Sequence, residues 1–109
     1  MKSVSRTNGK SRRPGHRQYA KLIQSHRRDL QEQYKVREIG IFGSFVRGEQ
    51  RKRSDVDILV DFDEIPDLLK FIRLERYLES ILKRKVDLVR KQAIRPELRD
   101  IVLQEVVYV

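Results

Sequence analysis

The chain has 109 residues, of which 39% are hydrophobic and 38% are charged. A chain of this length can form one domain with one modest core. Because cysteine is absent, disulfide scaffolds, thiolate metal sites and cysteine nucleophiles are excluded. The formal net charge is +9. The whole excess lies in residues 1–37, which hold 11 basic and 2 acidic residues, whereas residues 38–109 hold 14 of each.

The N-terminal segment is basic and contains the chain-breaking pairs Asn8-Gly9 and Pro14-Gly15. We expect a flexible basic arm over residues 1–16 and one domain over residues 17–109. Such an arm can bind nucleic acid, an acidic protein face or a triphosphate, or it can simply be a solubilising tail. Nucleic acid is not favoured, because no aromatic residue interrupts the basic run Lys10–Arg13 to provide a stacking surface.

Apolar runs along the chain are short. None approaches the roughly 18 residues of a membrane span, and no hydrophobic segment follows the N-terminal basic residues as in a secretory signal. We therefore expect a soluble cytoplasmic protein without a membrane partner.

The first expected elements are a helix and two strands. Apolar residues spaced three and four apart predict one amphipathic helix over residues 17–35. A β-branched and aromatic run predicts a strand over Val36–Phe42, followed by a helical turn at Phe45–Gly48. The next strand, Val56–Phe62, contains an uninterrupted apolar stretch, which is typical of a strand buried on both faces.

The second half of the chain predicts two more helices and one more strand. Pro66 is a favourable first residue for a helix that ends in Lys83-Arg84-Lys85, and most of its broad apolar stripe is expected in the core. A strand over Val86–Val89 and a helix from Pro96 to about Gln104 follow. Val106–Val109 is either an edge strand or a tail packed on the core. This order predicts an α/β (α+β) fold with a small mixed sheet and flanking helices.

Two carboxylates stand at the start of the second strand. Asp55 and Asp57 are two residues apart, so their side chains point to the same face of the strand. Two like charges so placed are costly unless cations neutralise them, and Mg²⁺ prefers carboxylate and phosphate oxygens. Asp87 is the only acidic residue of the third strand, and it joins the pair if the two strands are neighbours. The alternative is that all three are solvated surface carboxylates.

A second group of residues lies between the first two strands. A glycine at a strand end, Gly43, allows a ligand to approach the backbone closely. Ser44 then stands where an N-cap is expected, and its hydroxyl can bind phosphate oxygens or merely cap the helical turn. Arg47 lies three residues further on the same helical side, where it can hold phosphate or pair with an aspartate.

Together these residues form one long motif, Gly-Ser-x-x-Arg-Gly from Gly43 to Gly48 and Ser-Asp-x-Asp from Ser54 to Asp57, followed by three apolar residues. In this motif the chain resembles the nucleotidyltransferase superfamily related to DNA polymerase β. It is most similar there to the minimal nucleotidyltransferases (MNT), which are small stand-alone members. The resemblance covers about Val36 to Val109, and Asp87 in its Val-Asp-Leu-Val context matches the third carboxylate of the family.

The resemblance implies a polymerase β-like fold and a Mg²⁺-dependent transfer of a nucleoside monophosphate to a hydroxyl. Asp55, Asp57 and Asp87 would be the catalytic, metal-binding residues and would hold two Mg²⁺ ions. Gly43, Ser44, Arg47 and Ser54 would bind the nucleotide. Relatives of this size often act as antitoxins beside a HEPN toxin. The implied function is therefore AMP transfer from ATP to a hydroxyl, expected on a tyrosine, of a partner HEPN toxin.

Other functions compatible with the sequence are a non-catalytic antitoxin that neutralises its toxin by binding and a nucleotidyltransferase for small molecules. The presence of Ser44 together with all three aspartates favours an enzyme, because a degenerate site is expected to lose one of them. A small-molecule acceptor is disfavoured, since 109 residues leave no room for a second domain with an acceptor pocket.

Overall fold

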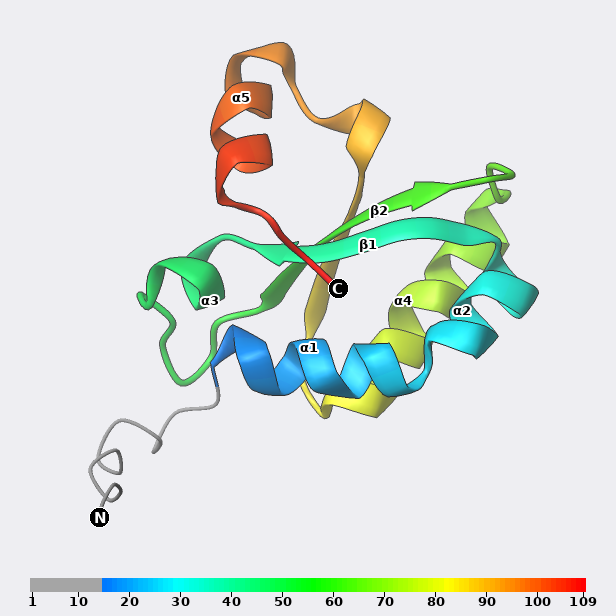
Figure 1. The fold of residues 1–109 in the computed structure, drawn as a ribbon, viewed down its shortest axis with the longest axis horizontal. Helices are drawn as coiled ribbons and strands as arrows, with labels where there is room; N and C mark the ends of the chain where they lie inside the picture. The colour runs from blue at the N-terminus through cyan, green and yellow to red at the C-terminus, as the bar shows by residue number, and fades with distance from the viewer. Residues whose placement is uncertain (1–14) are drawn as a thin grey trace.

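The computed structural model describes residues 15–109, so the predicted basic arm falls almost entirely outside the described residues. A four-stranded sheet with the strand order β3-β2-β1-β4 forms the centre of the described part (Figure 1). β1 (Val36–Phe42) runs antiparallel to β2 (Val56–Phe62) and to β4 (Val107–Tyr108), whereas β3 (Val86–Arg90) runs parallel to β2. The predicted α/β fold with a small mixed sheet is confirmed, and the C-terminal residues form an edge strand.

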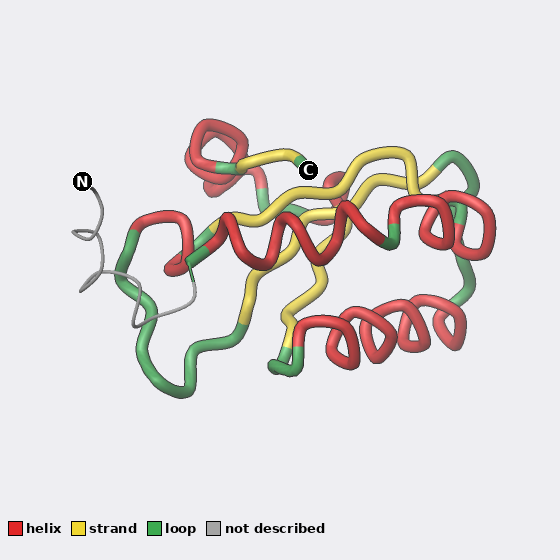
Figure 2. Tube along the Cα trace, turned by 60° about the horizontal axis from the view of Figure 1, so that its bottom comes forward, coloured by secondary structure: helices red, strands yellow, loops and turns green. Residues whose placement is uncertain are grey.

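Helices lie on both sides of this sheet. α1 (His16–Ser25), α2 (Arg27–Tyr34) and α4 (Leu68–Leu82) lie on one side, and the 3₁₀ helix η2 (Lys91–Ala93) and α5 (Pro96–Glu105) lie on the other (Figure 1). The short helix α3 (Ser44–Arg47) connects β1 towards β2. Figure 2 shows α1 and α2 in one row and α4 in a second row beside it. None of the helices in residues 15–109 is long and apolar enough to cross a membrane.

The main core lies between the sheet and the layer of α1, α2 and α4. Every second residue of β2 contributes to it, and the helices supply Ile23, Leu30, Leu74 and Leu78, all almost fully buried. The core residues of β2 are Val56, Ile58, Val60 and Phe62. Because side chains alternate along a strand, Asp57, Leu59 and Asp61 lie on the opposite face. The fold therefore separates an apolar face of β2 from an acidic one.

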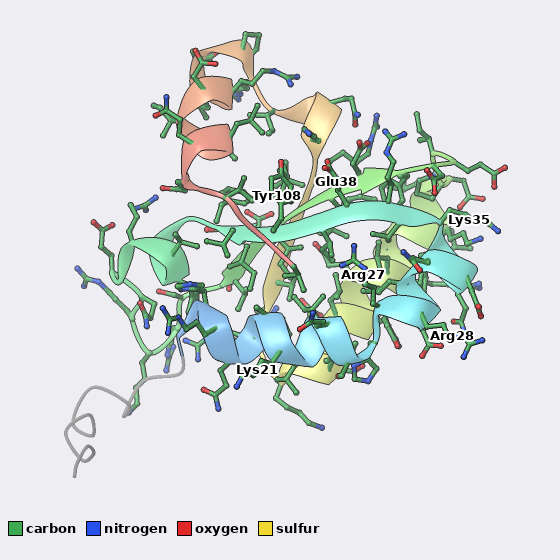
Figure 3. The ribbon with its side chains drawn as sticks, in the orientation of Figure 1. Lys21, Arg27, Arg28, Lys35, Glu38 and Tyr108 are labelled. Atoms are coloured by element: carbon green, nitrogen blue, oxygen red, sulfur yellow. The ribbon has the colours of Figure 1, made fainter. Side chains whose placement is uncertain are left out.

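The acidic face is partly covered by η2. Gln92 Nε2 donates to Asp61 Oδ1 over 2.8 Å, and Lys91 Nζ donates to Glu38 Oε1 over 3.1 Å. The Lys91 ammonium also lies 5.8 Å from the centre of the Tyr108 ring. Figure 3 shows Glu38 on β1 and Tyr108 on β4. These contacts attach the segment after β3 to β1, β4 and the C-terminal end of β2, away from the end at which Asp55 and Asp57 lie.

The predicted single helix over residues 17–35 is interrupted. α1 ends at Ser25, and His26 has φ −112° and ψ 16° before α2 begins at Arg27. The Leu22 carbonyl accepts a hydrogen bond from Ser25 Oγ at 2.7 Å and lies 2.9 Å from His26 Nδ1. The backbone N–H of His26 bonds instead to Ile23, three residues back. Side-chain groups thus compete for the carbonyl that would continue the helix, which explains the break.

α4 begins and ends at different residues from those predicted. Asp67 is the N-cap and accepts a hydrogen bond from the Lys70 N–H at 2.8 Å, so the helix starts at Leu68 rather than at Pro66. Lys83 adopts the left-handed conformation, with φ 56°, and ends the helix. In the apolar stripe Leu74, Leu78 and Leu82 are buried and Phe71 packs partly buried against the core, whereas Leu68 is 75% exposed and Leu69 and Ile72 are also exposed.

Candidate active site

The three aspartates predicted to act together lie at one end of β2 and β3. The parallel pairing of these strands places Asp57 directly opposite Asp87. Residues opposite each other in a sheet project to the same face. Asp55 directly precedes β2, and its charge acts on the Asp57 carboxyl group. Asp55 and Asp87 are exposed, and Asp57 is partly buried. The strand neighbourhood that the sequence analysis required is therefore present.

The carboxyl group of Asp57 has an unusually high pKa. Burial, together with the smaller effects of the neighbouring charges of Asp87 and Asp55, raises the pKa of Asp57 to about 6, while Arg47 acts in the opposite direction. Burial and the two carboxylates penalise the ionised form in the absence of a cation. The arrangement stores unfavourable electrostatic energy that a bound positive charge would relieve.

Asp61 provides an internal comparison on the same face of β2. Burial by itself raises the pKa of Asp61, but hydrogen bonds from Arg37 and Gln92 outweigh this effect and lower the pKa below its usual value. Arg37 Nη2 lies 2.7 Å from Asp61 Oδ2. Asp61 is thus a structural carboxylate with its own partners, whereas within residues 15–109 no residue donates a hydrogen bond to the Asp57 carboxylate.

The chemistry of these side chains fits a hard divalent cation, because Mg²⁺ binds carboxylate oxygens and favours sites with one or two carboxylates plus phosphates. In the described part of the chain, no three acidic or histidine side chains converge into a finished metal cage. Asp55, Asp57 and Asp87 are therefore candidate ligands whose side chains would have to rotate towards a common ion. Phosphate oxygens of a substrate would complete such a site.

Gly43 lies against Asp57. It has φ +78°, and a Cβ atom at this position would lie 2.1 Å from Asp57 Oδ2. Both the backbone conformation and the contact therefore require glycine. The Gly43 carbonyl accepts hydrogen bonds from the Val46 and Arg47 N–H groups, which makes Gly43 the N-cap of α3.

Ser44 is the first residue of α3 and not its N-cap, which corrects the expectation from the sequence. The helix begins one residue earlier than expected, at Ser44, directly after Gly43 with its φ of 78°. Within residues 15–109 the Ser44 hydroxyl makes no hydrogen bond. It is therefore available to a ligand at the end of β1, beside Gly43.

We expect Gly43→Ala to lower the free energy of unfolding by about 2 kcal/mol or more, since it adds left-handed strain to a steric conflict with Asp57. Gly48→Ala is the matched control, because Gly48 has φ +74° and nothing within 4 Å of the added Cβ. The control should lose about 1 kcal/mol. Chemical denaturation of both variants measures the difference, and equal losses would show that the contact with Asp57 is unimportant.

Glu105, at the C-terminal end of α5, is a site residue that the sequence analysis missed. Its Oε2 accepts a hydrogen bond from the Gly43 N–H at 2.8 Å, and its two carboxylate oxygens lie 3.0 and 3.2 Å from Arg47 Nη1. Arg47 also contacts Glu49 Oε1 at 2.8 Å, so it pairs with glutamates rather than with an aspartate. The Glu105 side chain is only 17% exposed. A carboxylate thus already occupies the donors expected to face a phosphate.

Ser54, the remaining predicted nucleotide-binding residue, is engaged within its own loop. Its hydroxyl accepts a hydrogen bond from the Arg51 N–H at 2.7 Å, and its carbonyl accepts one from Arg84 Nε at 2.8 Å. These bonds give Ser54 a structural part in the loop before β2. A direct contact between Ser54 and a nucleotide stays a prediction.

The sequence and the fold of this chain are similar to those of known proteins. The family described as Nucleotidyltransferase domain matches residues 23–109. The protein adenylyltransferase MntA of Thermococcus cleftensis is 57% identical over 88 residues, which cover 81% of this chain and 89% of the relative. A solved structure assigned to the minimal nucleotidyltransferases has a TM-score of 0.65 and 35% identity, covering 81% of this chain and 93% of that one.

A toxin–antitoxin structure with AMP-PNP has a TM-score of 0.63 and 28% identity, covering 77% of this chain and 69% of that one. The chain belongs to the nucleotidyltransferase domain family, and the protein is a nucleotidyltransferase. The family resemblance seen in the motif from Gly43 to Asp57 is thereby confirmed.

Proposed function

We propose that this protein transfers AMP from ATP to a hydroxyl group of a HEPN toxin, with tyrosine as the acceptor, and that it thereby acts as an antitoxin. The observation that carries the proposal is the pairing of Asp57 with Asp87 across β2 and β3, beside the Gly43-Ser44 turn. The similarity to a protein adenylyltransferase and to a toxin–antitoxin structure with AMP-PNP supports the class of reaction.

In the proposed reaction, the acceptor oxygen forms a bond to the α-phosphorus while the bond from that phosphorus to the β-phosphate oxygen breaks, and pyrophosphate leaves. Asp55, Asp57 and Asp87 would hold Mg²⁺. Bound Mg²⁺ would stabilise the developing charge and make the acceptor oxygen a better nucleophile. The Asp87 carboxylate, on the exposed side of the pair, would take the proton of the acceptor hydroxyl. Ser44, the Gly43 N–H and Arg47 would hold the β- and γ-phosphates.

The contact between Glu105 and these phosphate-binding groups has a consequence for nucleotide affinity. A triphosphate that uses the Gly43 N–H and the Arg47 guanidinium must displace the Glu105 carboxylate, which has the same sign of charge. We expect Glu105→Gln to lower the KM for ATP about three- to tenfold with kcat nearly unchanged, since a neutral amide competes less well for charge-assisted hydrogen bonds.

Steady-state kinetics with ATP measures this effect. Glu49→Gln is the control, because Glu49 also contacts Arg47 but its side chain is 64% exposed. A higher KM together with a lower kcat in Glu105→Gln would instead assign Glu105 to the positioning of Arg47.

The function itself is tested by incubating the protein with ATP, Mg²⁺ and a purified HEPN toxin and then measuring intact masses. We expect the toxin to gain whole adenylyl groups, and peptide mapping should place them on tyrosine. A mass increase that is absent with Asp57→Asn attributes transfer to this site. Full neutralisation of the toxin by Asp57→Asn in cells would instead favour an antitoxin that acts by binding alone.

A further inference from the structure

A basic pocket adjoins the candidate active site. It has a volume of about 420 Å³ and opens between the loop before β2 and the turn before β3. The residues that line it are Lys52, Arg53, Ser54, Asp55, Lys83, Arg84 and Lys85. Five of these seven carry a positive charge, and the one acidic member, Asp55, is a candidate metal ligand.

Arg84 holds this pocket in shape. Its Nε donates to the Ser54 carbonyl at 2.8 Å, and its Nη2 donates to the Arg51 and Lys52 carbonyls at 2.8 and 2.7 Å. The guanidinium carbon lies 5.0 Å from the centre of the Phe45 ring, which belongs to the core. The loop and the turn are therefore fixed to one another, and the pocket does not depend on flexible side chains for its position.

The other cations of the pocket form no ion pair in the part of the chain that the structure describes. Within residues 15–109, no carboxylate forms an ion pair with Lys52, Arg53, Lys83 or Lys85. Four such charges side by side repel one another, so a bound anionic group would relieve the repulsion. Arg84 is the exception, because its Nε and Nη2 groups donate to carbonyl groups of the protein.

The pocket lies on the β3 side of β2, whereas the proposed phosphate-binding groups come from the β1 side. Lys85 precedes Val86 and Asp87 directly, and its carbonyl accepts a hydrogen bond from the Val56 N–H at 2.9 Å. Gly43 and Ser44 follow β1, the neighbour of β2 on its other edge. In an in-line displacement the acceptor approaches opposite the leaving pyrophosphate. The acceptor side of the reaction is therefore the side on which the basic pocket lies.

We infer that the pocket binds an acidic protein segment that carries the acceptor hydroxyl. This inference rests on the proposed function. Carboxylate side chains next to the acceptor would meet the ammonium groups of Lys52, Lys83 and Lys85. A nucleic-acid strand is the weaker candidate, because no aromatic residue lines the pocket for base stacking. The charge of the pocket thus selects the acceptor and speeds its encounter with the site.

The test uses three fluorescent probes of equal length, without ATP or Mg²⁺. They are a peptide with one tyrosine flanked by glutamates, the same peptide flanked by serines, and a single-stranded RNA. The test variant is Lys52→Glu with Lys85→Glu, which leaves Arg84 and the shape of the pocket intact. The control is Lys70→Glu with Arg73→Glu, which changes the charge by the same amount. Both residues are exposed and lie near the N-terminal end of α4, roughly 15–20 Å along the helix from Lys83.

We expect the acidic peptide to bind at least about tenfold more tightly than the serine peptide, and less tightly as salt is raised. The test variant should lose this preference and the control should keep it, with unchanged circular dichroism in both. Equal binding of the two peptides, or an unaffected test variant, overturns the inference. Tighter binding of the RNA that the test variant also loses overturns it in favour of a nucleic-acid acceptor.

AMP transfer to the acidic peptide is measured separately, with Mg²⁺ and ATP. If Asp57→Asn abolishes transfer but the pocket variant leaves the KM for the peptide unchanged, the proposed function stands and the pocket inference fails. If the binding preference holds but no transfer to any protein acceptor is found, the pocket inference stands as a binding site and the proposed function fails.

Discussion

Asp57→Asn should abolish AMP transfer and, at neutral pH, stabilise the metal-free protein. Both effects have one origin. Burial and the charges of Asp87 and Asp55 raise the pKa of Asp57 to about 6, against a usual value near 3.8. The ionised carboxylate is therefore unfavourable in the fold until a cation binds it. Asparagine has the same shape without the charge, so Asp57→Asn removes this cost and also removes a candidate metal ligand.

The pH dependence of this gain has a definite sign. Because the pKa of Asp57 is higher in the folded than in the unfolded state, the protein binds more protons when folded between about pH 4 and pH 6. The destabilising effect of Asp57 is therefore absent below pH 4, grows as the pH rises through 6, and is complete at pH 7. There the expected gain in the free energy of unfolding is on the order of 2 kcal/mol.

Denaturation of the wild type and Asp57→Asn at pH 4 and pH 7, each without and with Mg²⁺, measures these effects. Mg²⁺ should stabilise the wild type more than the variant, since it binds the folded state through Asp57. Asp61→Asn is the control with the opposite sign, because Arg37 and Gln92 stabilise the ionised Asp61. A large loss of stability in Asp57→Asn at pH 7 would show that Asp57 is a structural residue.

The strands and the aspartate cluster were predictable from the sequence because they depend on local patterns. Val36–Phe42 and Val56–Phe62 have the bounds that their apolar runs predicted, and Ile58–Phe62 is buried on both faces. The alignment of Asp57 with Asp87 required one further assumption, that β2 and β3 are neighbours, and the parallel register meets it.

Features that depend on distant contacts were not predictable in the same way. Glu105 reaches Gly43 and Arg47 from 62 and 58 residues away, and no spacing in the sequence marks it. The exposure of Leu68 depends on which elements pack against α4, which helical periodicity does not contain. The break at His26 depends on side-chain hydrogen bonds to the Leu22 carbonyl, which amphipathic spacing does not reveal either.

Ser44→Ala should reduce the rate of AMP transfer by about 10²–10³, the usual loss when a preorganised donor to developing charge is removed. The structure makes this variant more informative than the sequence alone did. Had Ser44 been the N-cap, its loss would have cost about 1 kcal/mol of stability. Gly43 is the cap instead, and within residues 15–109 the Ser44 hydroxyl makes no hydrogen bond. The melting temperature should therefore stay nearly unchanged.

Transfer rates at saturating ATP and thermal melts of the same preparation measure the two effects together. Ser25→Ala is the control, because the Ser25 hydroxyl bonds to the Leu22 carbonyl on the far layer of helices and should affect stability slightly but not the rate. The rate loss in Ser44→Ala should appear mainly in kcat, since the donor acts as charge develops on the leaving pyrophosphate. Near-normal transfer by Ser44→Ala would remove Ser44 from the active site and leave Gly43 and Arg47 as the groups that hold the phosphates.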